Sequence, residues 1–167
     1  SAFYDGSLVT DPSPPLPCPH VSPYSLVDVR SGSSSSSGTS FENVEEAKHA
    51  CRVAAELKRH YPRTVLLTPY SAQLRRLRSY RSGVEAYTVD SFQGKEADAV
   101  VLSLVRTPGS GSGFWSDPRR LAVALTRAKH AMRVVCHSGW ADSDPSSPLG
   151  ALVSDARTRG AVVAVDA

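Results

Sequence analysis

The sequence predicts an α/β domain whose parallel sheet carries helices on both faces. Short apolar runs alternate along the chain with segments of helical periodicity, which is the order found in βαβ units. Residues 99–105 read AVVLSLV, with Ser103 as the polar break. A continuous apolar run of this kind is typical of a parallel strand that is buried on both faces.

The chain is long enough for one domain with a sizeable core. It has 167 residues, of which 41% are hydrophobic. We therefore expect a single domain over residues 1–167, with a loop-rich part over 1–40 and the packed core over 41–167. Because the sequence does not begin with Met, we expect it to be part of a longer protein.

The first strand and helix of the core follow from local signals. A strand is expected over residues 25–30 (SLVDVR), followed by a helix that begins after Asn43 and ends near His60. Asn43 is a suitable N-cap, and Glu46, three residues further on, completes a capping box. We assign this helix no chemistry and expect His49 and His60 to lie at its surface.

The next unit pairs a buried strand with a basic helix. Residues 64–68 (TVLLT) form a buried strand that ends before Pro69. The helix that follows, from about Ser71 to Gly83, has arginines on one side and leucines on the other. We favour a solvated face for these arginines over a phosphate-binding face. A strand over residues 84–89 then returns to the sheet.

A third helix is expected to begin at Pro118, with Asp117 as its N-cap. It contains residues 119–129, which read RRLAVALTRAK. Arg120 and Arg127 are seven residues apart, so we expect them to project from nearly the same side of this helix. Four residues at helical spacing form its apolar face, namely Leu121, Ala124, Leu125 and Ala128.

The rest of the chain combines three expected elements with two segments of biased composition. A strand over residues 132–136, a helix within 147–159 and a strand over 161–165 complete the core. Residues 11–23 are dense in proline, which excludes a helix there. Residues 31–40 are rich in Ser and Gly, and we expect a flexible surface loop, favouring a tolerated insertion over a phosphorylation segment.

Charge, hydrophobic runs and cysteine spacing limit the classes of protein to which the chain can belong. The net charge of +3 is compatible with binding to nucleic acid, but it does not by itself indicate such binding. Because no apolar run reaches about 18 residues, we expect no membrane span. Cys18, Cys51 and Cys136 have the spacing of neither a zinc site nor a disulfide framework. We therefore expect no metal site and an intracellular protein of the nucleus or cytoplasm.

A polar turn precedes the long apolar strand. Residues 91–98 contain a glycine and five polar or charged residues, namely Ser91, Gln93, Gly94, Lys95, Glu96 and Asp98. Gly94 lets a ligand approach the backbone, and Lys95 and Glu96 offer opposite charges beside it. The turn alone is equally compatible with a phosphate or ribose site and with a solvated connection between two strands.

Four segments together resemble superfamily 1 helicases, in the branch that contains the nonsense-mediated-decay helicase and senataxin. VDSFQGKEAD, at residues 89–98, resembles motif V, and RRLAVALTRAK resembles motif VI. LLTPYSAQ, at residues 66–73, resembles motif IV, and FYDGSL, at residues 3–8, resembles the opening of the second motor domain. The matches come in the family's order, so the resemblance implies a second RecA-like domain.

The resemblance implies a nucleotide site for ATP. Arg127 would be the arginine finger, which offers positive charge to the γ-phosphate in the transition state. Gly94 would approach the γ-phosphate through its backbone, and Glu96 would hydrogen-bond the ribose. Gln93 and Lys95 belong to the same turn. Arg120, the other arginine noted on the third helix, would orient the site or form a structural salt bridge, and these two alternatives stay open.

The resemblance also implies contacts to single-stranded RNA or DNA. Thr68 and Ser91 would bind backbone phosphates, which carry no sequence information. Thr88 is a weaker candidate of the same kind. Tyr70 would either stack on a base or pack inside the domain. We expect the nucleotide and nucleic-acid residues to share one edge of the sheet, at the tips of its parallel strands.

The chain lacks part of what ATP hydrolysis requires. It contains no G-x-x-x-x-G-K-[ST] sequence, since its one Gly-Lys pair, Gly94 and Lys95, is followed by Glu96. By resemblance, the P-loop and the ligands of Mg²⁺ belong to the first RecA-like domain of the same protein, so the isolated chain should be inactive. Ala122 stands where the family commonly has Asn. The alternative is therefore a degenerate, non-catalytic nucleic-acid-binding or protein-interaction module.

Overall fold

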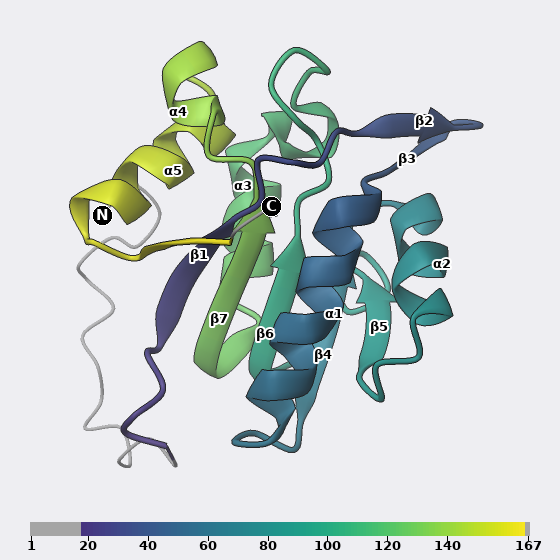
Figure 1. The fold of residues 1–167 in the computed structure, drawn as a ribbon, viewed down its shortest axis with the longest axis vertical. Coiled ribbons are helices and arrows are strands. Elements are labelled where there is room, and N and C mark those ends of the chain that lie inside the picture. The colour runs from purple at the N-terminus through teal and green to yellow at the C-terminus, as the bar shows by residue number, and fades with distance from the viewer. Residues whose placement is uncertain (1–17, 166–167) are drawn as a thin grey trace.

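A computed structural model describes residues 18–165, within which six strands form one parallel sheet. The strand order is β5-β4-β6-β7-β1-β8 (Figure 1). The bounds of these strands are Tyr24–Asp28 (β1), Thr64–Thr68 (β4), Glu85–Thr88 (β5), Ala97–Ser103 (β6), Ala128–Cys136 (β7) and Val162–Ala164 (β8). The predicted RecA-like α/β fold is confirmed. Residues 3–8 and part of the proline-rich segment lie outside the described residues.

Helices cover both faces of the sheet, as the sequence predicts (Figure 1). They are α1 (Val44–Lys58), α2 (Ser71–Ser79), α3 (Pro118–Leu125), α4 (Trp140–Ser143) and α5 (Pro148–Thr158), with a 3-10 helix over Gly113–Ser116. Successive residues of β6 point to opposite faces, so Val100 and Leu102 join the core beneath α3 and α5, whereas Val101 joins the core beneath α1 and α2.

The N-terminus of α1 is tied into a buried polar network. The side chain of Asn43 caps α1 by accepting from the Glu46 amide at 3.0 Å, as predicted. The reciprocal half of the predicted capping box is wrong, because the Asn43 amide donates to Oε1 of Gln73 at 2.9 Å. The Glu46 carboxylate instead accepts from the Ser103 hydroxyl at 2.6 Å and from the Val105 amide at 2.7 Å.

This network holds the end of β6 in an unusual conformation. Val105 has a φ of 72°, in the left-handed region that β-branched residues rarely adopt. Its amide donates to Glu46, and its carbonyl accepts from Nδ2 of Asn43 at 3.2 Å. Gln73 adds a bond from Nε2 to the Ser103 hydroxyl at 3.0 Å. The four side chains of the network, those of Asn43, Glu46, Gln73 and Ser103, are fully buried.

The Ser/Gly tract is ordered, which corrects the expectation of a flexible loop. Part of it forms an antiparallel hairpin of β2 (Ser35–Ser37) and β3 (Ser40–Glu42). Gly38 has a φ of 62° at its turn, which a glycine adopts without strain. The Ser40 hydroxyl accepts from the Ala72 amide at 3.1 Å, and Glu42 pairs with Arg76 at 3.1 Å. These bonds to α2 hold the hairpin against the domain.

The prediction for the two histidines is half right. His60 is exposed, as expected, whereas His49 is buried. His49 follows the buried Glu46 by three residues, so it lies beside the buried face of α1 rather than opposite to it. Burial lowers the pKa of His49, which favours the neutral ring.

Helix α3 ends four residues earlier than the sequence predicts. It runs to Leu125, and Ala128 is the first residue of β7 instead of part of the apolar face of α3. The cause is strand pairing, since the Ala97 amide donates to the Arg127 carbonyl at 3.1 Å and β6 pairs with β7 from its first residue. Arg120 and Arg127 therefore do not share one helix.

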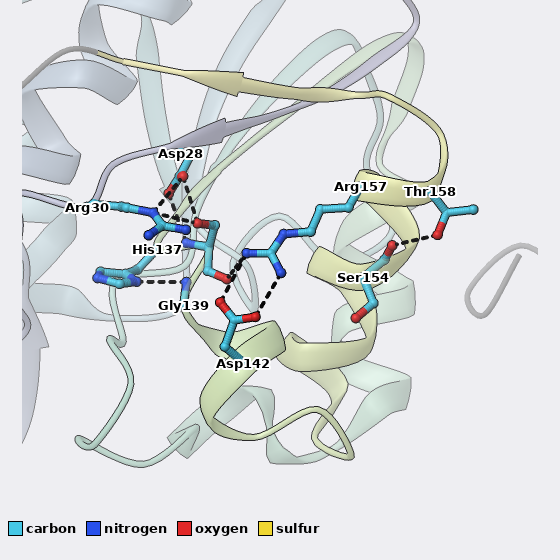
Figure 2. Close-up of polar contacts among 9 residues, drawn as sticks. Asp28, Arg30, His137, Gly139, Asp142, Ser154, Arg157 and Thr158 are labelled. Atoms are coloured by element: carbon cyan, nitrogen blue, oxygen red, sulfur yellow. Dashed lines mark hydrogen bonds and ion pairs between the residues drawn. The ribbon is translucent and has the colours of Figure 1, made fainter.

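Polar contacts fix the carboxyl ends of β1 and β7 to the C-terminal helices. Asp28 accepts from the amide and the hydroxyl of Ser138, at 2.9 and 2.7 Å, and Arg30 donates to the same carboxylate at 3.1 Å. Figure 2 shows Arg157 of α5 reaching both carboxylate oxygens of Asp142 in α4. The bidentate pair joins α4 to α5. Among residues 18–165, no helix combines the length and the apolar character that a bilayer span requires.

Replacing Glu46 with Gln tests the buried network through the pH dependence of stability. Burial raises the pKa of Glu46 from 4.5 to about 7. A raised folded-state pKa contributes stability that is fully present below the unfolded-state pKa and is lost as the pH rises through about 7. This group alone should lower the free energy of unfolding by about 3 kcal/mol across that interval.

The measurement is urea unfolding of the wild type and of Glu46→Gln at pH 5 and pH 8. The variant should lose the decrease in stability that Glu46 causes between these pH values, whereas the neighbouring control Glu45→Gln should retain it. Equal pH dependence in the wild type and Glu46→Gln would contradict the assignment.

Candidate nucleotide and nucleic-acid site

The residues that resemble motif V form a segment that crosses the sheet. Residues 89–96, here called the crossing segment, leave the carboxyl end of β5 and return to the amino end of β6. They pass over β4 on the face that α3 covers, because Phe92 is buried in the same core as Leu121 and Leu67. The crossing segment and α3 both run from the carboxyl to the amino side of the sheet, and they lie side by side.

A shallow hollow of about 220 Å³ lies between the crossing segment and the start of α3. Its lining includes Asp90 and Gln93 from the crossing segment and Arg119 and Arg120 from α3. The Arg120 guanidinium lies 4.6 Å from the ring centroid of Phe114, which also lines the hollow. The structure thus brings together the two predicted nucleotide-site residues Gln93 and Arg120.

Arg119 contributes to the local structure of α3. Asp117 caps the helix by accepting from the Arg119 amide at 2.9 Å, as predicted. The Arg119 guanidinium pairs with the same carboxylate and holds the pKa of Asp117 below its usual value. The N-cap therefore stays ionised at the positive end of the helix dipole.

Arg127 lies beyond the other end of α3, beside the last residues of the crossing segment. Its Nε donates to the Val123 carbonyl at 3.0 Å, Nη1 to the Lys95 carbonyl at 3.4 Å, and Nη2 to the Thr126 hydroxyl at 3.4 Å. These bonds occupy three of the five N–H groups of the guanidinium. The side chain is half-buried and is not part of the core.

The other predicted residues of the turn are exposed around Arg127. Gly94 has a φ of 79° and is exposed, as are Lys95 and Glu96. The Glu96 carbonyl accepts from Nη2 of Arg63 at 3.2 Å. Arg63 and Arg127 therefore hold two successive carbonyls of the crossing segment. The sequence did not indicate a role for Arg63, because this residue precedes β4 and lies far from motif V in the chain.

The predicted nucleic-acid residues lie at the opposite side of the sheet. Thr68 and Thr88 end β4 and β5, and they pair with one another in the parallel ladder. Lys95, Glu96 and Arg127, in contrast, lie at the amino ends of β6 and β7. The expectation that both sets share one edge is therefore wrong for Lys95, Glu96 and Arg127, because the crossing segment spans the length of the strands. Arg120, at the start of α3, lies instead on the carboxyl side beside Asp90.

Two of the predicted phosphate ligands already have contacts within the domain. The Ser91 amide donates to the Thr88 hydroxyl at 3.1 Å, and the Ser91 hydroxyl donates to the Thr88 carbonyl at 3.0 Å. Thr68 is fully buried, and its hydroxyl has no hydrogen-bond partner within the described part of the chain. Ser91 is exposed, whereas the Thr68 side chain does not reach the surface in this conformation.

Tyr70 is neither fully exposed, as stacking on a base would favour, nor fully packed inside the domain. It is half-buried at the N-cap position of α2, with the edge of its ring against Phe41 at a centroid distance of 5.4 Å. Its hydroxyl accepts from the Phe114 amide at 3.2 Å. Sequence reasoning missed Phe41 and Phe114, although the aromatic pair directly after the Gly-rich residues 108–113 was a usable signal.

Comparison with known proteins supplies the family. The profile of a protein family described as "AAA domain" matches residues 1–139. Helicase sen1 of Schizosaccharomyces pombe is 35% identical over 160 residues, which cover 84% of this chain and 9% of that protein. ATP-dependent helicase upf1 of the same organism is 39% identical over 116 residues, which cover 60% and 12% of the two chains. A regulator of nonsense transcripts 1 homolog of Arabidopsis thaliana is 35% identical over 160 residues, covering 81% and 13%.

The parallel sheet and the crossing segment beside α3 define a RecA-like domain of the helicase class. The chain belongs to the AAA domain family, in the superfamily 1 helicase branch that includes sen1 and the regulators of nonsense transcripts. It spans between 9% and 13% of the length of the three relatives described above.

Substitution of Gly94 tests the backbone conformation of the turn. A Cβ at this position would meet no atom within 4 Å, so the cost of Gly94→Ala is one of backbone conformation alone. We expect a loss of about 1 kcal/mol in the free energy of unfolding, and a smaller loss for Gly94→Asn, because Asn tolerates the left-handed region better. Urea unfolding of both variants is the measurement, and an unchanged stability in Gly94→Ala would show that the turn is not held at positive φ.

Proposed function

We propose that this chain is the second motor domain of an ATP-dependent RNA or DNA helicase, with Arg127 as its arginine finger. The observation that carries the proposal is the position of Arg127 beside the exposed turn of Gly94, Lys95 and Glu96. Three protein acceptors orient the guanidinium, which leaves N–H groups that a phosphate could accept from. A pre-oriented cation stabilises transferring phosphate charge at little reorganisation cost.

The neighbouring residues have chemistry that suits the rest of ATP. The exposed backbone of Gly94 can approach a phosphate, and the Glu96 carboxylate can accept hydrogen bonds from ribose hydroxyls. Lys95 and Arg120 add positive charge, and Gln93 adds an amide. Among residues 18–165, no group of three or more His, Cys, Asp or Glu could hold a metal ion. We therefore assign the ligands of Mg²⁺ to the first RecA-like domain of the same protein, which we propose as the partner in hydrolysis.

The carboxyl ends of β4 and β5 supply the proposed path for single-stranded RNA or DNA. Ser91 and Thr88 would bind backbone phosphates without reading sequence, and Tyr70 offers a partly exposed aromatic ring. The Ser91 donors would exchange their bonds to Thr88 for bonds to phosphate. Thr68 requires a local movement before its hydroxyl can bind.

The crossing segment couples these two sets of residues. It begins beside Thr88 and Ser91 and ends at Glu96, so a closure on ATP that moves its end would also move Ser91 along the bound strand. Release of phosphate would reverse the movement. Because the catalytic pocket would form between two domains, the isolated chain should not hydrolyse ATP. We place the whole protein in the nucleus or the cytoplasm, where its nucleic-acid substrates occur.

Ala122 favours a second candidate, a degenerate clamp that binds nucleic acid without turnover. It lies on α3 between Arg120 and Arg127 and places a methyl group where the family commonly has an amide. Measuring ATP turnover of the longer protein with and without single strands separates the candidates. Turnover that single strands stimulate supports the motor, whereas strand binding without turnover supports the clamp.

Replacing Arg127 with Ala tests the finger in a longer protein that carries both motor domains. We expect kcat for ATP to fall at least about 1,000-fold, since an arginine finger contributes on that order. The affinity for a single strand without nucleotide should stay within about twofold of the wild type, because the strand contacts lie at the other side of the sheet. Lys129→Ala is the control, as it removes one positive charge two residues away. An equal loss of turnover and strand binding would contradict the role.

Replacing Ser91 with Ala tests the strand contact. Loss of one hydrogen bond to phosphate should weaken single-strand binding about two- to tenfold, and equally for different sequences. Ser154→Ala, on the exposed side of α5, is the matched control. Fluorescence anisotropy with labelled strands of several sequences is the measurement, and a sequence-dependent loss would argue against a phosphate contact.

A further inference from the structure

A second set of contacts joins Tyr70, of the proposed strand path, to Arg120, one of the proposed nucleotide residues, at the carboxyl side of the sheet. Tyr70 follows β4 at its carboxyl end, and its hydroxyl accepts from the amide of Phe114, which is 44 residues away in the chain. The ring of Phe114 in turn faces the guanidinium of Arg120, at 4.6 Å from its centroid. One residue, Phe114, thus contacts Tyr70 through its backbone and Arg120 through its ring.

Neighbouring residues pack against Phe114 and Tyr70. Phe114 packs at right angles to Trp115, which is fully buried and donates from its indole nitrogen to the Leu104 carbonyl at 2.9 Å. On the other side, Tyr70 packs against Phe41, and the Arg106 guanidinium lies 3.8 Å from the centroid of that ring. Arg106 also donates to the Ser110 carbonyl.

The segment that carries Phe114 follows three glycines with positive φ. Gly109, Gly111 and Gly113 precede it, with φ values of 90°, 80° and 53°, in the region that glycine adopts without strain. A Cβ on Gly113 would lie 2.6 Å from the Tyr70 hydroxyl, so a larger residue would push the two segments apart. Gly113 therefore lets the backbone before Phe114 approach Tyr70 closely, while Trp115 anchors the chain after it.

We propose that the Tyr70–Phe114–Arg120 set is a coupling route between nucleotide and single strand, separate from the crossing segment, in which Phe114 is a positioning residue. The proposal rests on the proposed function. A phosphate and the Phe114 ring compete for the same guanidinium, because the full negative charge attracts it more strongly than the ring face does. When nucleotide withdraws Arg120, Phe114 is released, its amide leaves the Tyr70 hydroxyl, and Tyr70 becomes free to meet a base.

The quantity that tests this route is the coupling ratio, defined as the dissociation constant of a single strand without nucleotide divided by that with a non-hydrolysable ATP analogue. It is measured in the longer protein with both motor domains. We expect the wild-type ratio to differ from one by at least about fivefold, the lower range of site-to-site coupling. Tyr70→Phe removes the acceptor and keeps the ring, and Phe114→Leu removes the ring and keeps the amide. Each should bring the ratio at least halfway to one on a logarithmic scale.

The controls separate a coupling role from a merely structural one. Phe114→Tyr retains the ring face and should restore the wild-type ratio, and Tyr80→Phe, at the end of α2, should leave it unchanged. The double variant Tyr70→Phe with Phe114→Leu should match the stronger single variant, because both act in one route.

The results distinguish a failure of the coupling route from a failure of the proposed motor function. A ratio in Tyr70→Phe equal to that of the wild type would overturn the coupling route and leave the motor proposal standing. Additive effects in the double variant would also overturn it. If the wild-type protein bound neither ligand, the proposed function itself would fail.

Discussion

The buried network around Glu46 is the constraint on which the rest of the structure depends. Its carboxylate accepts from Ser103 and Val105 at the end of β6, while Gln73 of α2 holds both Asn43 and Ser103. Burial of an ionisable group costs free energy unless its hydrogen bonds are made. The network therefore specifies one arrangement of α1, α2 and β6, which a purely apolar contact would specify less sharply.

The strain at Val105 has a structural consequence. A left-handed β-branched residue costs on the order of 1–3 kcal/mol, and the bonds from Glu46 and Asn43 offset this cost. The turn directs the chain away from the sheet into residues 106–113, which the Arg106 side chain supports. The position of Phe114, and with it the aromatic contact to Tyr70, thus depends on a network that lies on a different helix and strand.

The sequence predicted which residues belong to the candidate site, but not how they are arranged in space. The motif V and motif VI segments indicated the residues, and Asp117 with Pro118 indicated the start of α3. The end of α3 was missed because helical spacing continues through Ala128, whereas the pairing of β7 with Ala97 ends the helix sooner. The burial of Thr68 and the hydrogen bonds of Ser91 to Thr88 could not be predicted from the sequence either, since both arise from contacts to neighbouring strands and turns.

The sequence by itself determined the α/β class, the buried strands and the caps of α1 and α3, because these follow from residue type and local spacing. The tertiary structure decided which charged groups meet. It placed Arg127 beside Lys95 and Arg120 over Phe114, and it separated Lys95, Glu96 and Arg127 from the strand residues by the length of a β-strand. Such contacts depend on the order of strands in the sheet and on the path of the crossing segment, and no local pattern of residues encodes either.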